Sequence, residues 1–165
     1  MPGVGAFSHA MNTLRDFNLD ETLRIFAKTG RPILGICLGM QMLSLESSEF
    51  GFTKGLGLCN CKVDRLGGLK EESDLRLPHV SWGSIKSNQF TSHWLFDGIE
   101  ETDKFYFIHS FGVKNTENDV LATSEYKNIV FASLIENKNV IGTQFHPEKS
   151  GVKGLKMLEN FINKK

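Results

Sequence analysis

The chain has 165 residues, 40% of them hydrophobic and 23% charged, and its 19 basic and 19 acidic residues leave a formal net charge of zero. This length suits one domain, and the composition is that of a globular protein without membrane-length apolar runs. A neutral chain gives no support for a nucleic-acid groove or an anionic membrane surface, and we expect neither as a partner. Three cysteines without framework spacing favour a reducing compartment, so the cytoplasm is the expected location.

The first half of the sequence alternates between helical and strand patterns. Ser8 and Asp20 are candidate N-caps, and Gly30 can close the second helix. The expected elements are helices at 8–17 and 20–30, a short apolar strand at 33–36 and a helix at 38–45. This order favours a parallel sheet that is buried on both faces.

The second half changes to strand patterns between glycine-rich or charged loops. The expected strands are 58–66, 80–87, 104–113, 120–126, 129–136 and 140–145, followed by a helix from about 152. Residues 127–128 and 137–139 read as turns of two successive hairpins. Parallel strands followed by antiparallel ones predict an α/β fold with a mixed sheet covered by helices.

The most informative segment is residues 35–41 (GICLGMQ), which follows the apolar strand and opens a helix. This G-x-C-x-G pattern is the cysteine form of the nucleophile elbow, in which glycines permit a sharp strand-to-helix turn. The helix N-terminus is expected to favour the Cys37 thiolate, and the backbone N–H of Leu38 is placed to donate to an oxyanion. A buried structural cysteine in a strand-turn-helix is the alternative.

A second segment, residues 142–148 (GTQFHPE), supplies a base and an orienting carboxylate. Residues two apart in extended chain project to the same side, so His146 and Glu148 fit these two roles beside a thiol. Pro147 biases the residue before it toward an extended path. Taken alone, this segment favours a surface loop over a catalytic pair. The other histidines lack a carboxylate at that spacing: His9, His79, His93 and His109.

Three further segments receive plainer interpretations. Residues 2–5 (PGVG) form either a strand end that supplies a second oxyanion donor or an ordinary strand-to-helix turn. Cys59 and Cys61 lack the further ligands of a zinc site and are assigned to one face of a strand. Residues 55–58 (GLGL) predict a turn, and residues 71–74 (EESD) a solvated loop.

Several segments together resemble the glutaminase subunits of imidazole glycerol phosphate synthase, which are class I (triad) glutamine amidotransferases. The matching pieces run in family order: 2–7 (PGVGAF), 35–41 (GICLGMQ), 78–82 (PHVSW), 106–110 (YFIHS) and 142–151 (GTQFHPEKSG). The elbow and the His-Pro-Glu segment are common to all class I members, whereas PHVSW and HS point to the histidine-biosynthesis branch. The resemblance implies a flavodoxin-like three-layer α/β fold whose mixed central sheet is parallel first and antiparallel later.

The resemblance also implies a mechanism. Cys37 attacks the side-chain carbonyl of glutamine, His146 moves the protons, and Glu148 holds the His146 tautomer. The implied oxyanion and substrate-binding residues are Gly3, Val4, Gly5, Leu38, Gln41, His109, Ser110 and Phe111. The products are glutamate and ammonia, and no metal or cofactor is implied.

The resemblance further implies a heterodimer in which ammonia passes to a synthase (cyclase) partner. Trp82, Tyr106 and Lys149 lie in or beside family motifs and are expected at the partner interface. The alternative for the two aromatic residues is an ordinary core position. Because Ser81-Trp82-Gly83 replaces the usual Gly-Trp-Asn, a paralogous glutaminase that feeds a surface-sugar amidotransferase is a second possible function. A cysteine hydrolase of similar fold and a non-catalytic binding subunit are further alternatives.

The family places a strand-helix-strand unit before the segment that corresponds to residues 2–5. We therefore expect residues 1–165 to form one amidotransferase domain that is incomplete at its N-terminus. In that case residues 2–5 lie beside 33–37 at an exposed sheet edge. We further expect mobile amides at Gly3–Gly5, a poorly formed oxyanion hole and little glutaminase activity in this chain alone.

Overall fold

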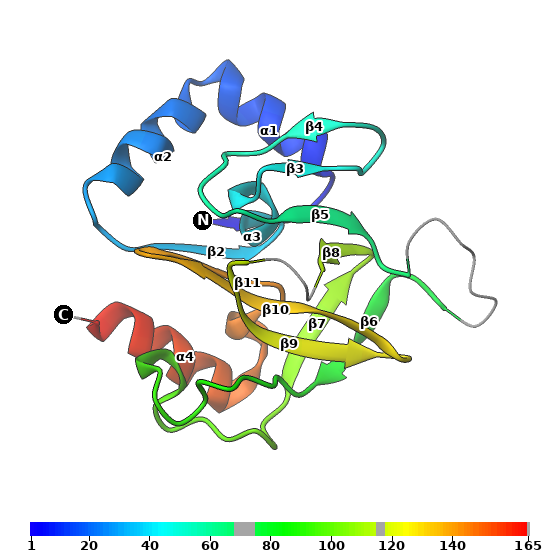
Figure 1. The fold of residues 1–165 in the computed structure, drawn as a ribbon, viewed down its shortest axis with the longest axis vertical. Helices are drawn as coiled ribbons and strands as arrows, with labels where there is room; N and C mark the ends of the chain where they lie inside the picture. The colour runs from blue at the N-terminus through cyan, green and yellow to red at the C-terminus, as the bar shows by residue number, and fades with distance from the viewer. Residues whose placement is uncertain (68–74, 115–117, 165) are drawn as a thin grey trace.

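A five-stranded sheet forms the centre of the computed structural model, which describes residues 1–67, 75–114 and 118–164 (Figure 1). Its strands, in spatial order, are β1 (Pro2–Gly3), β2 (Ile33–Cys37), β11 (Val140–Thr143), β10 (Ile129–Asn137) and β9 (Val120–Tyr126). The first three strands are mutually parallel, and β10 is antiparallel to both β11 and β9. The expected mixed sheet is confirmed.

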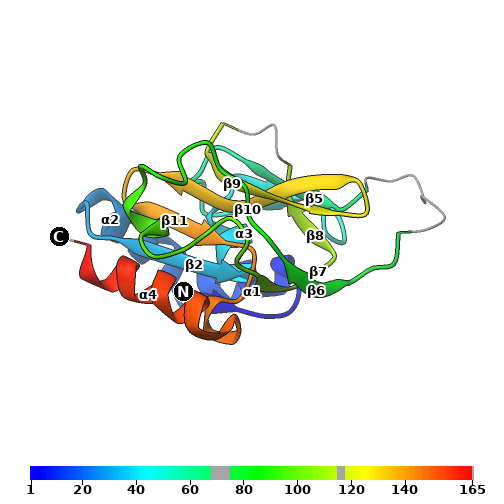
Figure 2. The same cartoon turned by 90° about the horizontal axis from the view of Figure 1, so that it is seen from below.

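Helices cover both faces of this sheet and produce three layers (Figures 1 and 2). The helices α1 (Phe7–Asp16), α2 (Leu19–Lys28) and α3 (Leu38–Leu43) lie on one face, and α4 (Gly151–Asn163) lies on the other. Phe7, Met11 and Met40 pack in the first core, while Phe107, Phe145 and others fill the second. Each buried face thus removes apolar surface from water, which is the main stabilising term in folding.

Two smaller sheets flank the central one. The first contains β4 (Thr53–Lys54), β3 (Glu46–Ser47), β5 (Lys62–Arg65) and β8 (Phe111–Val113) in that order. The second is an antiparallel pair of β6 (His79–Gly83) and β7 (Phe105–His109). Two short 3-10 turns, η1 (Trp94–Phe96) and η2 (Pro147–Lys149), complete the elements.

The expected N-caps of the first two helices are wrong, whereas Gly30 closes α2 as expected, with φ 77°. Ala6 and Asn18 occupy the N-cap positions of α1 and α2, and neither makes a side-chain cap bond. The backbone N–H of Phe7 donates instead to the Glu49 carboxylate, 2.7 Å away. Asp20 lies in the first turn of α2, where it pairs with Arg24 at 2.9 Å. A carboxylate from a distant segment therefore replaces the local cap of α1.

Two expected strands are also wrong in extent. The strand predicted at 58–66 is shortened to β5, because the backbone N–H groups of Leu58 and Cys59 both donate to the Leu43 carbonyl at the end of α3. The loop that precedes β5 therefore satisfies carbonyls that the short helix leaves free. Cys59 and Cys61 consequently precede the strand, as buried thiols, and do not share a strand face.

The strand predicted at 104–113 is interrupted at Ser110. Its two halves, β7 and β8, pair with different partners, β6 and β5 respectively. The strand predicted at 80–87 likewise ends early, at Gly83. The helix predicted at 38–45 ends at Leu43, since Glu46 and Ser47 join β3.

The hairpins and the last helix agree with the sequence. Lys127 and Asn128 both have positive φ, 46° and 66°, as a two-residue hairpin turn requires. The helix expected from about residue 152 is α4, which buries Met157 and leaves Leu155 exposed. No helix within the described residues is both long and apolar enough to cross a membrane.

The strand β1 lies at one edge of the central sheet, as expected for residues 2–5. Pro2 pairs with Ile36 and Gly3 with Cys37, and no described strand borders β1 on its other side. The chain leaves the sheet directly after Gly3, so the Val4 side chain is 82% exposed. The expected mobility of the Gly3–Gly5 amides stays a prediction.

Candidate active site

Cys37, at the turn from β2 into α3, has an unusual backbone conformation. Cys37 has φ 55° and ψ −111°, values that a residue other than glycine rarely adopts. Glycines make the turn possible, because a Cβ on Gly35 would lie 2.7 Å from the Gly39 carbonyl, and a Cβ on Gly39 would overlap the Met1 carbonyl oxygen. The predicted nucleophile elbow is therefore present in the fold.

Burial governs the protonation of this cysteine. Desolvation raises the pKa of the Cys37 thiol from 9.0 to about 11, and the Leu38 backbone N–H beside the sulfur lowers it only in part. The nearby Glu148 charge raises the pKa further, whereas Lys149 lowers it. The expectation that the helix N-terminus favours the thiolate is therefore wrong for the unliganded chain, because burial outweighs the N–H dipoles. A base must remove the proton.

His146 and Glu148 form the expected base and orienting pair. The His146 Nδ1 atom lies 2.7 Å from a Glu148 carboxylate oxygen. Within the described residues, the buried Nε2 atom has no hydrogen-bond partner. Because the carboxylate accepts a hydrogen bond from Nδ1–H, the bare Nε2 lone pair is the one available to a substrate or a thiol.

Backbone bonds hold the His146 segment in place. The His146 N–H donates to the Tyr106 carbonyl at 2.9 Å, and the Ser150 hydroxyl donates to the His146 carbonyl at 2.6 Å. His146 itself is extended, as its neighbour Pro147 predicts, although residues 147–149 turn into η2. The separation of two residues thus brings base and carboxylate together through a tight turn.

A cavity of about 300 Å³, which is large enough for a small ligand, is lined by both Cys37 and His146. Most of the predicted oxyanion and substrate residues lie along it. Its lining includes Val4, Gly5, Cys37, Leu38, Gln41, His109, Ser110, Phe111 and His146. Gly3 and Glu148 stand behind this lining, since Gly3 pairs with Cys37 in the sheet and Glu148 bonds His146. The break between β7 and β8 at Ser110 opens this part of the cavity.

Two glutamine side chains are bonded to each other at the cavity: Gln41 lines it, and Gln144 is buried behind it. The Gln41 Nε2 atom donates to the Phe111 carbonyl at 2.9 Å and to Gln144 Oε1 at 3.0 Å. Gln144 Nε2 in turn lies 3.8 Å from Cys37 Sγ. Both N–H groups of Gln41 are thus used internally, so Oε1 is the atom that this side chain can offer to a ligand.

Sequence reasoning missed Glu49, Pro78 and Ile108, which also line the cavity. Glu49 is the most informative of them, since it places a carboxylate in the cavity and also accepts from Phe7 N–H. It follows α3 by six residues and shares no periodicity with the elbow, so no sequence signal marked it. Gln144, inside the His-Pro-Glu segment, was likewise not assigned a role.

The residues expected at the partner interface are not core residues. Trp82 is 54% exposed and its ring contacts Tyr106 edge to face, with ring centroids 5.9 Å apart. Lys149 is exposed, directly after Glu148. The Tyr106 carbonyl also accepts the hydrogen bond from the His146 N–H, so the exposed surface around Trp82 and Tyr106 is connected to His146 by a single hydrogen bond.

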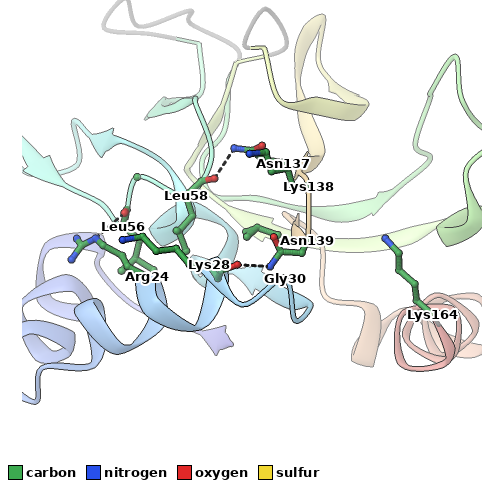
Figure 3. Close-up of a pocket in the computed structure, with 12 residues that line it drawn as sticks. Arg24, Lys28, Gly30, Leu56, Leu58, Asn137, Lys138, Asn139 and Lys164 are labelled. Carbon is green, nitrogen blue, oxygen red and sulfur yellow. Dashed lines mark hydrogen bonds between the residues drawn. The ribbon is translucent and has the colours of Figure 1, made fainter.

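A larger cavity of about 750 Å³ lies away from this chemistry (Figure 3). It borders α2, the 56–58 loop and the turn between β10 and β11, at the end of the sheet opposite Cys37. Lys164, directly after α4, reaches it from another side. Its two asparagines already serve the fold: Asn137 donates to the Leu58 carbonyl, and Asn139 donates to the carbonyls of Ala27 in α2 and Arg31 just before β2. Among the described residues that line it there is no nucleophile or histidine.

Cys59 and Cys61 do not form a metal site with the other described residues. Cys59 and Cys61 are buried outside any disulfide, and Cys61 Sγ lies 3.2 Å from Ser44 Oγ. Across the described ranges, no group of three or more His, Cys, Asp or Glu side chains is arranged to hold a metal ion. The segment 71–74, predicted as a solvated loop, lies outside the described residues.

Comparison with known proteins identifies the family of this chain and structures of similar fold. The family model described as "Glutamine amidotransferase class-I" matches residues 1–165. A solved structure titled "Crystal structure of glutamine amidotransferase" has a TM-score of 0.64 at 18% identity, over 97% of this chain and 76% of that one. PurLQS from Thermotoga maritima has a TM-score of 0.60 at 20% identity, over 88% and 67%. These structures bear on the fold alone.

The chain belongs to the class I glutamine amidotransferase family. Among its curated relatives, the "Imidazole glycerol phosphate synthase subunit HisH" of Methanosarcina barkeri is 44% identical, over 99% of this chain and 77% of the relative. The proteins of the same name from Helicobacter hepaticus and Geobacillus thermodenitrificans are 41% and 42% identical, each over 98% of this chain and over 73% and 75% of the relative.

Proposed function

We propose that this chain hydrolyses glutamine to glutamate and ammonia, and that the ammonia passes to a cyclase subunit for imidazole glycerol phosphate synthesis in histidine biosynthesis. The observation that carries the proposal is one cavity that holds Cys37 at a nucleophile elbow and the bare Nε2 of His146. The similarity to HisH subunits supports the choice of pathway. The three cysteines outside disulfides suit a cytoplasmic location.

The proposed reaction begins with proton transfer. His146 Nε2 takes the proton from the Cys37 thiol, and the thiolate sulfur attacks the side-chain carbonyl carbon of glutamine. The Leu38 N–H and an amide at Val4 or Gly5 bind the oxyanion that forms. Collapse of this intermediate breaks the carbon–nitrogen bond while His146 returns the proton to the leaving ammonia. Water, activated by His146, then hydrolyses the thioester and releases glutamate.

The substrate's charged end fits the other side of the cavity. Backbone groups at 109–111 suit the α-carboxylate and α-amino groups, and Glu49 supplies a carboxylate for the α-ammonium group. Gln41 can accept a hydrogen bond through Oε1. Recognition of both ends of free glutamine distinguishes this site from that of a cysteine peptidase, which binds an extended chain.

A product assay tests the proposal. The chain, with and without its cyclase partner, is incubated with glutamine or with a glutamine-containing peptide, and glutamate and ammonia are measured. We expect release from free glutamine that depends on the partner. Cleavage of the peptide in preference to glutamine would favour the cysteine hydrolase. Glutamine hydrolysis without any coupling to the cyclase would favour the paralogous glutaminase.

Glu49 offers a prediction on substrate affinity. We expect Glu49→Gln to raise KM for glutamine about 10- to 100-fold, because it removes a charge-assisted bond to the α-ammonium group. The amide oxygen of the new side chain still accepts from Phe7 N–H, so the melting temperature stays near that of the parent. Steady-state kinetics and thermal unfolding check both parts. An unchanged KM would remove Glu49 from the substrate site.

Trp82 offers a prediction on partner binding. Trp82→Ala is expected to weaken association with the cyclase about 30-fold or more, because exposed tryptophans at interfaces are frequent binding anchors. Phe52→Ala, at a 67% exposed aromatic residue next to β4, is the matched control and leaves association unchanged. Calorimetry measures association and thermal unfolding measures stability. A large loss of stability with unchanged association would reject the interface role.

A further inference from the structure

Two buried histidines lie directly opposite each other on β6 and β7. His79 and His109 are register partners, with side chains 1% and 6% exposed. The His79 ring stacks on Tyr126 at 4.1 Å between centroids, and both rings contact Phe131 edge to face. Burying two polar rings among aromatic side chains is costly unless their nitrogens are hydrogen-bonded.

All four ring nitrogens have partners in one continuous chain. His109 Nδ1 lies 2.9 Å from the Phe111 carbonyl, and His109 Nε2 lies 3.2 Å from His79 Nδ1. His79 Nε2 lies 2.7 Å from Ser81 Oγ. Burial lowers the pKa of His79 to about 4 and that of His109 to about 3, so both rings are neutral near pH 7.

The carbonyl at one end sets the direction of every bond in this chain. A carbonyl only accepts, so His109 Nδ1 carries the proton and His109 Nε2 is bare. His79 Nδ1–H must then donate to His109, which leaves His79 Nε2 to accept from the Ser81 hydroxyl. Both rings are consequently in the Nδ1–H tautomer, which isolated histidine populates less than the Nε2–H form.

The same chain ends in the substrate cavity. The Phe111 carbonyl that accepts from His109 also accepts from Gln41, and Gln41 bonds Gln144 beside Cys37. His109 and Phe111 both line the cavity, whereas His79 lies behind them. The orientation of the Gln41 amide therefore depends on where the histidines hold the Phe111 carbonyl.

We propose that His79 and His109 are positioning residues for glutamine: a one-directional hydrogen-bond relay, Ser81 to His79 to His109, holds the Phe111 carbonyl and through it Gln41 in the substrate-binding orientation. This role deepens the proposed function and rests on it for its kinetic consequences. The alternative, a pair of histidines that only fills the core, predicts no particular tautomer and no link to glutamine affinity.

Nitrogen NMR of the imidazole rings tests the relay without any assay of activity. In the ¹⁵N-histidine-labelled chain near pH 7, we expect two rings besides His146, whose Nδ1–H donates to Glu148, to show the neutral Nδ1–H pattern. His146→Ala removes the His146 signals, and His79→Phe and Ser81→Ala identify the other two rings. His9, which is exposed, serves as the internal reference. An Nε2–H or doubly protonated pattern at either assigned ring would overturn the proposal.

Two substitutions at His79 separate hydrogen bonding from packing. His79→Phe keeps an aromatic ring on Tyr126 but removes the donor to His109, and we expect kcat/KM for glutamine to fall roughly 10- to 100-fold, mainly through KM. His79→Asn removes the ring but places an amide N–H near the Nδ1 position, and it should lose less of kcat/KM while losing more thermal stability. The enzyme is assayed with its cyclase partner.

The reverse order, with the asparagine variant kinetically worse than the phenylalanine variant, would show a packing role and overturn the proposal. Equal kinetics for both variants and the parent would overturn it as well. If the parent complex hydrolyses no glutamine, the proposed function fails, and the tautomer pattern still decides whether the relay exists.

Discussion

Cys37→Ala is expected to abolish glutamine-dependent synthesis by the complex, with a loss on the order of 10⁴-fold or more. Synthesis from added ammonium salt should survive, because the acceptor site lies in the cyclase partner. The physical reason is that no other described thiol lines the cavity with His146. Rates with glutamine and with ammonium salt, measured on the same preparation, check both statements.

Cys59→Ala is the matched control, since it removes a second buried thiol outside the cavity. We expect both activities to persist in this variant. Equal loss of the glutamine-dependent and ammonium-dependent reactions in Cys37→Ala would indicate a structural role for Cys37 and would contradict its assignment as the nucleophile.

The second large effect concerns the reactivity of Cys37 in the chain without partner or substrate. Its raised pKa, about 11 against an ordinary 9.0, favours the neutral thiol. The thiolate fraction near pH 7 is then about 100-fold lower than for an unperturbed thiol, and the alkylation rate should fall with it. The rate should rise about tenfold per pH unit and approach a plateau only near pH 11.

Iodoacetamide labelling of Cys37 as a function of pH, followed by mass spectrometry, measures this profile. The same chain unfolded in urea gives the reference thiol, and the plateau position separates a pKa effect from simple steric shielding. A plateau at or below pH 9 would contradict the burial argument. Glutamine bound in the cavity is expected to slow the labelling of Cys37, since it occupies the space through which iodoacetamide reaches the thiol.

Much of the site could be predicted because its chemistry is encoded in contiguous segments. The turn around Cys37 requires glycine at positions 35 and 39. A Cβ at either position would collide with a neighbouring backbone segment. The spacing of His146 and Glu148 likewise predicts the pair, although their 2.7 Å contact forms through the turn η2 and not through extended chain. Local steric requirements of this kind are visible in the sequence itself.

The remaining features depend on contacts between distant segments. The sequence of residues 104–113 does not reveal that the strand is interrupted at Ser110. The interruption arises because its first half pairs with β6 and its second half with β5, in different sheets. Glu49 joins the cavity because it binds the first N–H of α1. The Cys37 pKa was misjudged because helix-end dipoles are read from sequence, whereas the burial that outweighs them arises only in the folded chain.

The most direct test of Cys37 as the glutaminase nucleophile is covalent trapping. The chain in complex with its cyclase is treated with a glutamine analogue that carries an electrophilic ketone, and the modified residue is mapped by peptide mass spectrometry. The assignment predicts one adduct, on Cys37, that excess glutamine prevents and that accompanies loss of glutamine-dependent but not ammonium-dependent synthesis. An adduct on Cys59, Cys61 or another residue, with Cys37 unmodified and glutamine-dependent synthesis lost, would contradict it.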